Sequence, residues 1–98
     1  MQLSQYYVYM LTNNGNTVIY VGVTSDLTKR VWEHKEGIHA GFTKKFACNK
    51  LIYIEYFQWI NDAIDREKQL KAGSRQAKVD LINKENSNWN DLSLGWYH

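Results

Sequence analysis

Five side chains in this 98-residue sequence are of the types that hydrolyse phosphodiester bonds. They are two tyrosines, an arginine, a histidine and a glutamate: Tyr9, Tyr20, Arg30, His34 and Glu67. A hydroxyl or an imidazole can transfer a proton, a guanidinium can bind phosphate, and a carboxylate can hold a divalent cation. Because the five residues are far apart in the sequence, this chemistry requires a fold that brings them together.

The N-terminal part of the chain has the composition of a β-hairpin. Residues 6–12 and 17–24 are rich in β-branched and aromatic side chains, which favour strands. An Asn-Gly dipeptide between them is the strongest short signal for a hairpin turn. A two-residue turn there pairs Tyr9 with Tyr20, on the face opposite a wholly apolar face of valine, isoleucine and methionine. The two tyrosines are either ordinary strand aromatics or hydroxyls presented at a site.

Three helices, a basic loop and a third strand are predicted after the hairpin. Ser25 and Ser74 are the expected N-caps of the first and third helices. The predicted ranges in chain order are helix 25–36, loop 37–48 with one helical turn, strand 50–57, helix 59–72 and helix 74–85. This order predicts an α+β fold, with helices packed on a small three-stranded antiparallel sheet. We expect a single domain over residues 1–98.

Two polar side chains fall on helix faces that should pack inward. Glu67 lies inside the apolar stripe of the helix 59–72, and His34 projects close to Leu27 in the helix before it. An ionised carboxylate in such a place must pair with a base, lie at the edge of a cleft or bind a cation. Each residue also has an ordinary structural interpretation. Glu67 would then form a salt bridge to Arg30 or a nearby lysine, and His34 would be a hydrogen-bonded core histidine.

The basic residues are concentrated in two windows. Residues 29–50 contain six bases and two acids, and residues 66–84 contain the same numbers, a net charge of +4 in each window. The whole chain has a net charge of only +2. Runs of charge are commonly solvated faces, but two basic windows that meet in the fold would form a surface for a polyanion.

The composition excludes several classes of protein. A single cysteine, Cys48, rules out an internal disulfide and a cysteine-rich zinc site, and it fits a reducing compartment. The longest apolar-rich run, residues 51–60, is interrupted by Glu55 and is too short to cross a bilayer. The first residues lack the basic region and cleavage site of a signal peptide. We therefore expect a cytoplasmic protein with no membrane partner.

The hairpin and the helix after it resemble the GIY-YIG nuclease superfamily. The tripeptides YVY at 7–9 and YVG at 20–22 resemble its two half-motifs. Arg30 and His34 follow at the family's spacing, and Glu67 lies in a later helix, where the family places its metal ligand. The segments GFTKK, REKQLK and N-x-x-W-x-D-L resemble small stand-alone members of about this length. Single tripeptides are weak signals, but five positions in order are a strong one.

The resemblance implies a metal-dependent endonuclease with a role for each of the five residues. Tyr9 would activate or orient the attacking water, with His34 as proton acceptor. Tyr20 would hydrogen-bond water or phosphate, and Arg30 would bind the scissile phosphate. Glu67 would hold a single Mg²⁺ or Mn²⁺ ion.

Two positions depart from the family pattern. The glycine of the first half-motif is Tyr7 here. Val23 follows the second half-motif, whereas some members, including the N-terminal domain of the excinuclease C subunit, have lysine there. One electrophilic contact of those members is therefore missing from this sequence.

The resemblance also implies a nucleic-acid partner, DNA in particular, in repair or recombination, and a protein partner that assists target choice. We expect nucleic-acid contacts from these residues: Lys29, Lys35, Lys44, Lys45, Lys71 and Asn86. Two alternatives remain open at this point. In the first, the chain is a nucleic-acid-binding module with little or no cleavage. In the second, it is a protein-interaction domain in which Glu67 and Arg30 form a plain salt bridge.

Overall fold

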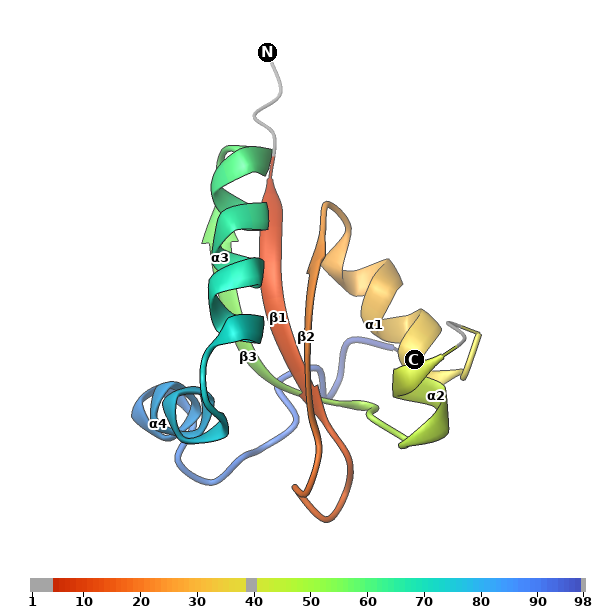
Figure 1. The fold of residues 1–98 in the computed structure, drawn as a ribbon. Coiled ribbons are helices and arrows are strands. Elements are labelled where there is room, and N and C mark those ends of the chain that lie inside the picture. Colours follow the sequence, from red (N-terminus) through yellow and green to blue (C-terminus); the bar gives the residue numbers. More distant parts are fainter. Residues whose placement is uncertain (1–4, 39–40, 98) are drawn as a thin grey trace.

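Helices lie on both sides of a small sheet in the computed structural model, which describes residues 5–38 and 41–97 (Figure 1). The elements in chain order are β1 Tyr6–Thr12, β2 Ile19–Thr24, α1 Leu27–Lys35, α2 Phe42–Lys45, β3 Lys50–Phe57, α3 Ile60–Ala72 and α4 Arg75–Glu85. The strands are antiparallel, in the order β2-β1-β3. The predicted α+β fold and its three-stranded sheet are confirmed. None of the described helices is long and apolar enough to cross a membrane.

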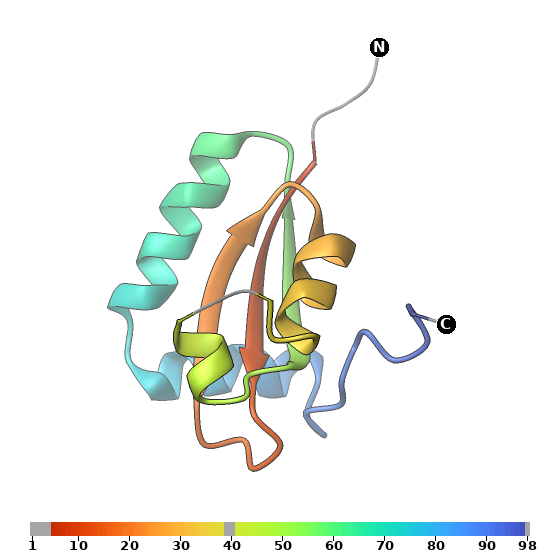
Figure 2. The ribbon, with the colours of Figure 1, turned by 90° about the vertical axis from the view of Figure 1, so that its right-hand side faces the viewer.

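Each face of the sheet carries its own apolar core. The predicted apolar face, with Val8 and Met10 of β1, packs against Ala63 and Leu70 of α3 and Ile82 of α4. The tyrosine-bearing face lies under α1 and contributes to a second cluster, whose buried members are Tyr9, Leu11, Leu27, Val31, Cys48 and Leu51. Figures 1 and 2 show α3 and α1 on opposite sides of the sheet, with α2 beside α1. Tyr9 is therefore part of a core and is not displayed on an open face.

The register of the β1–β2 hairpin differs from the prediction by two residues. Tyr9 pairs with Gly22, and Leu11 pairs with Tyr20. The predicted direct pairing of Tyr9 with Tyr20 is therefore wrong. Because a shift of two residues keeps every side chain on its face, the two tyrosines still lie on the same face, one diagonal step apart.

A side chain at the end of β1 accounts for the different register. Asn13 Oδ1 accepts hydrogen bonds from the backbone N–H groups of Thr17, at 2.9 Å, and Val18, at 3.2 Å. Asn13 Nδ2 also donates to Thr17 Oγ1 at 2.7 Å. These bonds stabilise a longer connection between the strands, in which Asn16 takes the left-handed conformation, with φ of 56°. The Asn-Gly dipeptide lies inside this loop and does not form the two-residue turn.

The helix boundaries follow capping side chains. The N-cap of α1 is Asp26, whose Oδ1 accepts from Lys29 N at 3.2 Å, so the predicted cap at Ser25 is wrong by one residue. The predicted cap of α4 is confirmed, because Ser74 Oγ accepts from Ala77 N at 3.0 Å. The single helical turn expected in the basic loop is α2.

The C-terminal segment returns across the edge of β3 to α1. Leu92 N donates to Leu51 O at 2.7 Å, and Leu51 N donates to Asp91 Oδ1 at 3.2 Å. Lys35 of α1 lies 2.6 Å from Asp91 Oδ2. Tyr97 adds a hydrogen bond from its hydroxyl to a carbonyl of α1 at 2.6 Å. These bonds hold α1, and the site residues on it, against the sheet.

Candidate active site

The five predicted catalytic residues converge on the hydroxyl of Tyr9. They come from four elements: Tyr9 from β1, Tyr20 from β2, Arg30 and His34 from α1, and Glu67 from α3. The Tyr9 hydroxyl hydrogen-bonds His34, and its ionisation is affected by Tyr20, Arg30 and Glu67. The rings of Tyr9, Tyr20 and His34 also contact one another, with centroid distances from 5.6 to 6.3 Å. The fold therefore assembles one cluster from residues 58 positions apart, Tyr9 to Glu67.

A glycine in β2 makes room for Tyr9. A Cβ atom at position 22 would lie 2.5 Å from both Cζ and the hydroxyl oxygen of Tyr9. Such distances are far inside van der Waals contact, so the Tyr9 phenol lies against the Gly22 backbone because that residue has no side chain. The register expected from the sequence, with Tyr9 opposite Tyr20, places Tyr7 opposite Gly22 and therefore did not predict this contact. The position of Gly22 inside a strand could have predicted this contact, because a glycine there often marks the close approach of another group.

Tyr7, which replaces the first glycine of the half-motif, lies at a different place on the sheet. It pairs with Thr24 in β2, and its ring packs edge-on against Tyr56 of β3, with centroids 6.0 Å apart. Its hydroxyl donates to Gln5 at 3.0 Å. Tyr7 therefore packs on Tyr56 of the edge strand β3, and its hydroxyl is bonded outside the Tyr9 cluster.

His34 is buried and bonded through both ring nitrogens. Its Nε2 lies 3.0 Å from the Tyr9 hydroxyl oxygen, and its Nδ1 lies 2.9 Å from Thr43 Oγ1. Only 4% of His34 and 3% of Thr43 are exposed. Thr43 belongs to α2 and lies in the GFTKK segment. It was not predicted to be a site residue. The sequence contains no clear signal for Thr43, because its segment is too short to show which helix face points inward.

The environment of Tyr9 keeps its hydroxyl protonated. Burial raises the pKa of Tyr9 above its ordinary value, and the nearby Tyr20 and Glu67 act in the same direction. Arg30 opposes this shift through its charge and a hydrogen bond, but the pKa remains raised. Tyr9 is fully buried, and its phenol therefore stays neutral beside His34.

Arg30 and Glu67 each have a charged neighbour on their own helix. Arg30 Nε lies 3.3 Å from Glu33 Oε1, and 34% of the Arg30 side chain is exposed. Glu67 Oε2 lies 3.5 Å from Lys71 Nζ. The ion pair expected from the structural interpretation of Glu67 is thus made with a nearby lysine. Both pairs are partly solvated, and pairs of this kind stabilise a protein little.

Glu67 has the properties of a ligand for one hard cation. Its side chain is 17% exposed, so a carboxylate oxygen can be reached while most of the side chain remains packed. Among the residues in the described ranges, no three His, Cys, Asp or Glu side chains form a metal-binding group. A single carboxylate fits Mg²⁺, which keeps several waters and completes its octahedron with substrate phosphate oxygens. Glu67 therefore fits the predicted role of a ligand for one divalent cation.

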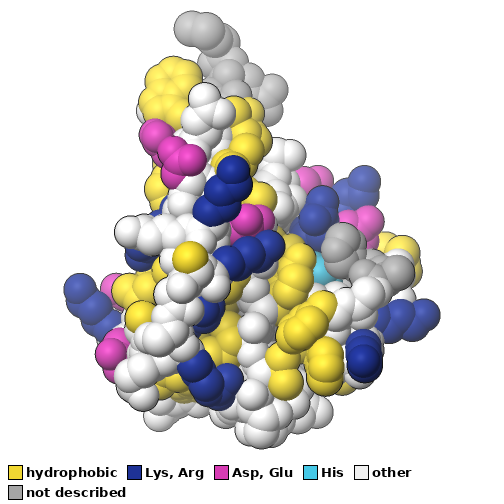
Figure 3. Space-filling view, in the orientation of Figure 1, with side chains coloured by type: hydrophobic (Ala, Val, Ile, Leu, Met, Phe, Trp, Pro, Cys, Tyr) yellow, Lys and Arg dark blue, Asp and Glu magenta, His cyan; other side chains and the backbone are white. Residues whose placement is uncertain are grey.

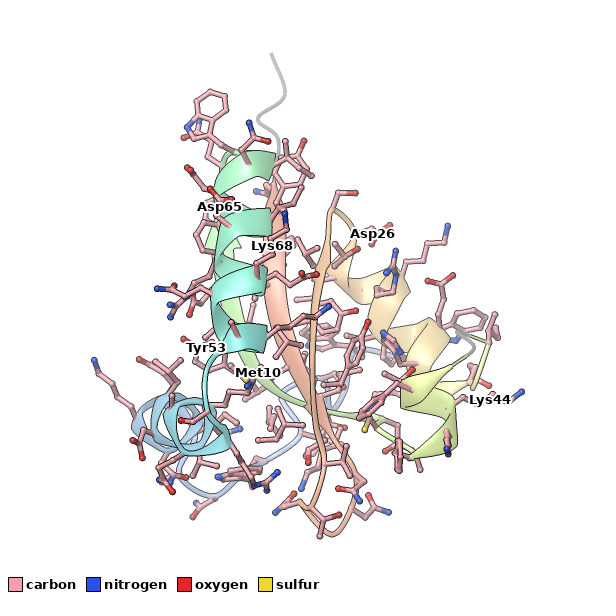
Figure 4. All side chains as sticks on the ribbon, viewed as in Figure 1. Met10, Asp26, Lys44, Tyr53, Asp65 and Lys68 are labelled. Atoms are coloured by element: carbon pink, nitrogen blue, oxygen red, sulfur yellow. The ribbon has the colours of Figure 1, made fainter. Side chains whose placement is uncertain are left out.

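Exposed lysines flank this cluster on two sides. Lys29, Lys44 and Lys45 are exposed on α1 and α2, and Lys71 Nζ of α3 lies 6.0 Å from the centre of the Tyr20 ring. Figure 3 shows dark-blue Lys and Arg side chains on either side of a yellow apolar strip between α3 and α2. In Figure 4, Lys68 lies on the side of α3 toward β2 and Asp65 on the other side. The lysines of α2 and Lys71 of α3 thus border the site, while the bases of α4, which belong to the second basic window, lie on the opposite face of the sheet.

Two residues that we expected to bind nucleic acid are engaged within the protein. Lys35 Nζ donates to Asp91 Oδ2 at 2.6 Å and to a backbone carbonyl at 2.8 Å. Asn86 is 8% exposed, and its amide donates to the carbonyls of Ile52 and Asn90. The hydrogen bonds of both side chains hold the C-terminal segment in place.

The chain is similar in sequence and fold to known proteins. The GIY-YIG catalytic domain family matches residues 5–86. A UPF0213 protein of Staphylococcus saprophyticus is 32% identical over 82 residues, which cover 84% of this chain and 99% of that protein. A UPF0213 protein of Syntrophus aciditrophicus is 36% identical over 81 residues, covering 82% and 92% of the two chains.

A solved structure agrees with these sequence matches. The solution NMR structure of a UPF0213 protein from Bacillus halodurans is 25% identical, and the match covers 93% of this chain and 97% of that one, with a TM-score of 0.58. The half-motif residues assembled around Tyr9 lie within the matched range 5–86. This protein therefore belongs to the GIY-YIG family, a family of nucleases, and the UPF0213 proteins are among its relatives.

Proposed function

We propose that this protein is a metal-dependent endonuclease that hydrolyses phosphodiester bonds in DNA. The observation that carries the proposal is the convergence of two tyrosines, an arginine, a histidine and a glutamate on one hydroxyl. Membership of the GIY-YIG family supports nuclease chemistry at this site. The exposed lysines on two sides of the cluster support a nucleic acid as the substrate.

The hydrogen bond between Tyr9 and His34 provides a path for the proton of the attacking water. The Tyr9 oxygen accepts a proton from the water, and the Tyr9 hydroxyl proton passes to His34 Nε2, 3.0 Å away. The resulting hydroxide attacks phosphorus, and the bond to the leaving oxygen breaks. Arg30 binds the non-bridging oxygens through its fork of donors and stabilises the charge that develops on them. Tyr20 orients the water or the phosphate from β2.

Glu67 would hold the cation that completes this chemistry. Mg²⁺ or Mn²⁺ bound there would neutralise the negative charge on the leaving oxygen. Lys71 Nζ lies 3.5 Å from the same carboxylate. Because Tyr9 is fully buried, the attacking water reaches its hydroxyl only when neighbouring side chains move.

Nicking of a panel of DNA substrates tests this function. The panel contains flap, bubble, junction and linear DNAs, each with Mg²⁺ or Mn²⁺. We expect cleavage by the wild type and its loss in Glu67→Gln and Arg30→Ala. The matched controls are Asp65→Asn, an exposed acid on the same helix, and Arg75→Ala, an exposed arginine of α4. Absence of cleavage by the wild type on every substrate, or equal cleavage by the site variants, would refute the proposal.

A nucleic-acid-binding module is the second candidate function. The complete burial of Tyr9 favours it, because an attacking water does not reach a buried hydroxyl. This function predicts salt-sensitive DNA binding that is weakened by Lys44→Glu/Lys45→Glu, with no cleavage by any variant. Binding without nicking in the panel would establish this second function over the first.

A further inference from the structure

A buried threonine contacts the second nitrogen of the His34 ring. Thr43 Oγ1 lies 2.9 Å from Nδ1, and the Tyr9 hydroxyl lies 3.0 Å from Nε2. Tyr9 is fully buried, and the other two residues are nearly so. The three side chains therefore form one enclosed series of hydrogen bonds. In a neutral imidazole, the protonation of one nitrogen decides whether the other donates or accepts.

The chemistry of the two hydroxyls determines the direction of these hydrogen bonds. The Tyr9 phenol is a stronger hydrogen-bond donor than the aliphatic hydroxyl of Thr43, and the positive charge of Arg30, which acts to lower the pKa of Tyr9, strengthens it further. The hydroxyl hydrogen then points to His34 Nε2, which must present a lone pair. Nδ1 consequently carries the hydrogen of the neutral ring and donates it to Thr43 Oγ1. In this assignment one ring nitrogen accepts and the other donates, as a neutral imidazole requires.

The short helix α2 and the turn after it hold Thr43 in place. The Thr43 carbonyl accepts from Cys48 N at 2.9 Å, and Cys48 is fully buried. The neighbouring Phe42 stacks on Tyr20, with ring centroids 6.0 Å apart and an angle of 28° between the planes. Helix α2 therefore supports two site residues, His34 through Thr43 and Tyr20 through Phe42.

We propose that Thr43 is a positioning residue that fixes the tautomer of His34, so that Nε2 faces Tyr9 with a lone pair. The significance of this role for catalysis rests on the proposed nuclease function, whereas the tautomer itself does not. When Nε2 takes the Tyr9 proton, the ring becomes an imidazolium with hydrogens on both nitrogens. The bond from Nδ1 to Thr43 Oγ1 is then charge-assisted and stronger, so Thr43 stabilises the protonated ring as well as the neutral one.

Nitrogen-15 NMR of the imidazole ring tests the tautomer without reference to activity. Spectra are recorded well above the ordinary histidine pKa of about 6.5, and the His34 signals are assigned by their loss in His34→Gln. We expect protonated Nδ1 and unprotonated Nε2 in the wild type and in Thr43→Ser. Thr43→Val, which keeps the shape and removes the hydroxyl, should lose this preference. Protonated Nε2 in the wild type, or an unchanged preference in Thr43→Val, would overturn the proposal.

Cleavage assays on the same variants test the consequence for the reaction. We expect Thr43→Val to cleave ~10–100-fold more slowly, as when the partner that orients a functional histidine is removed, and Thr43→Ser to restore the rate. Thr12→Val is the matched control, because it removes a fully buried hydroxyl, bonded to Val18 O at 2.7 Å, away from the site. Equal rates for Thr43→Val and the wild type would refute the positioning role. If the wild type cleaves no DNA, the proposed function fails and the NMR result alone decides the role of Thr43.

Discussion

Tyr9 reaches His34 across the backbone of β2, because residue 22 has no side chain. This contact is the narrowest fit in the site: a Cβ at position 22 would overlap the phenol at 2.5 Å. The hydroxyl itself is hydrogen-bonded to His34 Nε2, and the positive charge of Arg30 acts on it. Small displacements of Tyr9 would therefore break the proton path, even where the fold survives.

Gly22→Ala should damage both stability and cleavage. The added methyl must push the Tyr9 ring away or shift β2, and overpacking of this kind costs about 1–3 kcal/mol. Gly15→Ala is the matched control, since the nearest atom to a Cβ there is 3.8 Å away. Chemical denaturation measures the loss of stability, and single-turnover nicking measures the loss of activity. A variant at position 22 as stable and active as the one at position 15 would contradict the close contact with Tyr9.

The elements place the site through short, specific contacts at their ends. Helix α1 begins at the Asp26 cap, α2 is a single turn that supports His34 and Tyr20, and the C-terminal segment holds α1 through Asp91. The faces of the two hairpin strands were predictable, because successive side chains point to opposite sides of a strand and the tyrosines alternate with aliphatic residues. The contacts at the ends of the elements are made by single side chains. They leave no periodic pattern in the sequence and so could not be predicted from it.

Asp26→Ala should lower the free energy of unfolding, while Ser25→Ala should leave it nearly unchanged. Loss of an N-cap typically costs about 0.5–2 kcal/mol, and only Asp26 accepts the hydrogen bond from Lys29 N. Ser25 is exposed and was the cap that the sequence indicated. Urea denaturation of the two variants compares these residues directly. A larger loss in the Ser25 variant would show that α1 begins one residue earlier.

The C-terminal segment should also make stability depend on acid pH. Burial acts to raise the pKa of Asp91. The hydrogen bonds from Lys35 and Ser93, together with the positive charge of Lys35, outweigh burial and hold that pKa below its ordinary value. Asp91 therefore contributes stability above its unfolded pKa and loses it as pH falls through the lower folded pKa.

Asp91→Asn tests this dependence. The variant should be less stable than the wild type near neutral pH, and the difference should shrink as pH falls below the ordinary aspartate pKa of about 3.9, because protonation then removes the charge of the wild type. Thermal unfolding of both chains across this pH range measures the difference. A gap that stays constant with pH would show that the Asp91 charge does not contribute to stability.

At the scale of the whole molecule, net charge is a poor guide to its partners. The bases of α2 and those of α3 lie on either side of the site (Figure 3), although the total charge is only +2. Helix α4, with Lys78 and Lys84, packs on the other face of the sheet from α1 (Figures 1 and 2). Nucleic acid bound at the site should therefore contact α2 and not α4.

Salt dependence of DNA binding tests this division of the surface. Lys44→Glu/Lys45→Glu should weaken binding and reduce the slope of log K against log salt by about 2, one for each lost phosphate contact. Lys78→Glu/Lys84→Glu changes the total charge equally and should have a much smaller effect. Fluorescence anisotropy of a labelled oligonucleotide gives both slopes. Equal effects of the two double variants would show that DNA binding follows net charge and not the site.

The sequence predicted the elements, the strand faces and the α+β fold, because these depend on composition and periodicity over many residues. It did not predict the register, since the hydrogen bonds of Asn13 outweighed the turn preference of Asn-Gly. It also did not identify Thr43, whose contact with His34 depends on how the chain returns after α1. Glu67 was identified from its place on an inward face, and its partner was left open between Arg30 and a lysine.

The central claim is that Glu67 and the cluster around Tyr9 cut DNA, and one paired measurement on Glu67→Gln tests it most directly. Single-turnover cleavage and binding are measured on the same DNA substrate, with Mg²⁺ or Mn²⁺, for the wild type and this variant. Loss of a group that acts on the charge developing in the transition state predicts a fall in cleavage of ~10²–10³-fold, with DNA affinity nearly unchanged. Cleavage by Glu67→Gln at the wild-type rate would contradict the account.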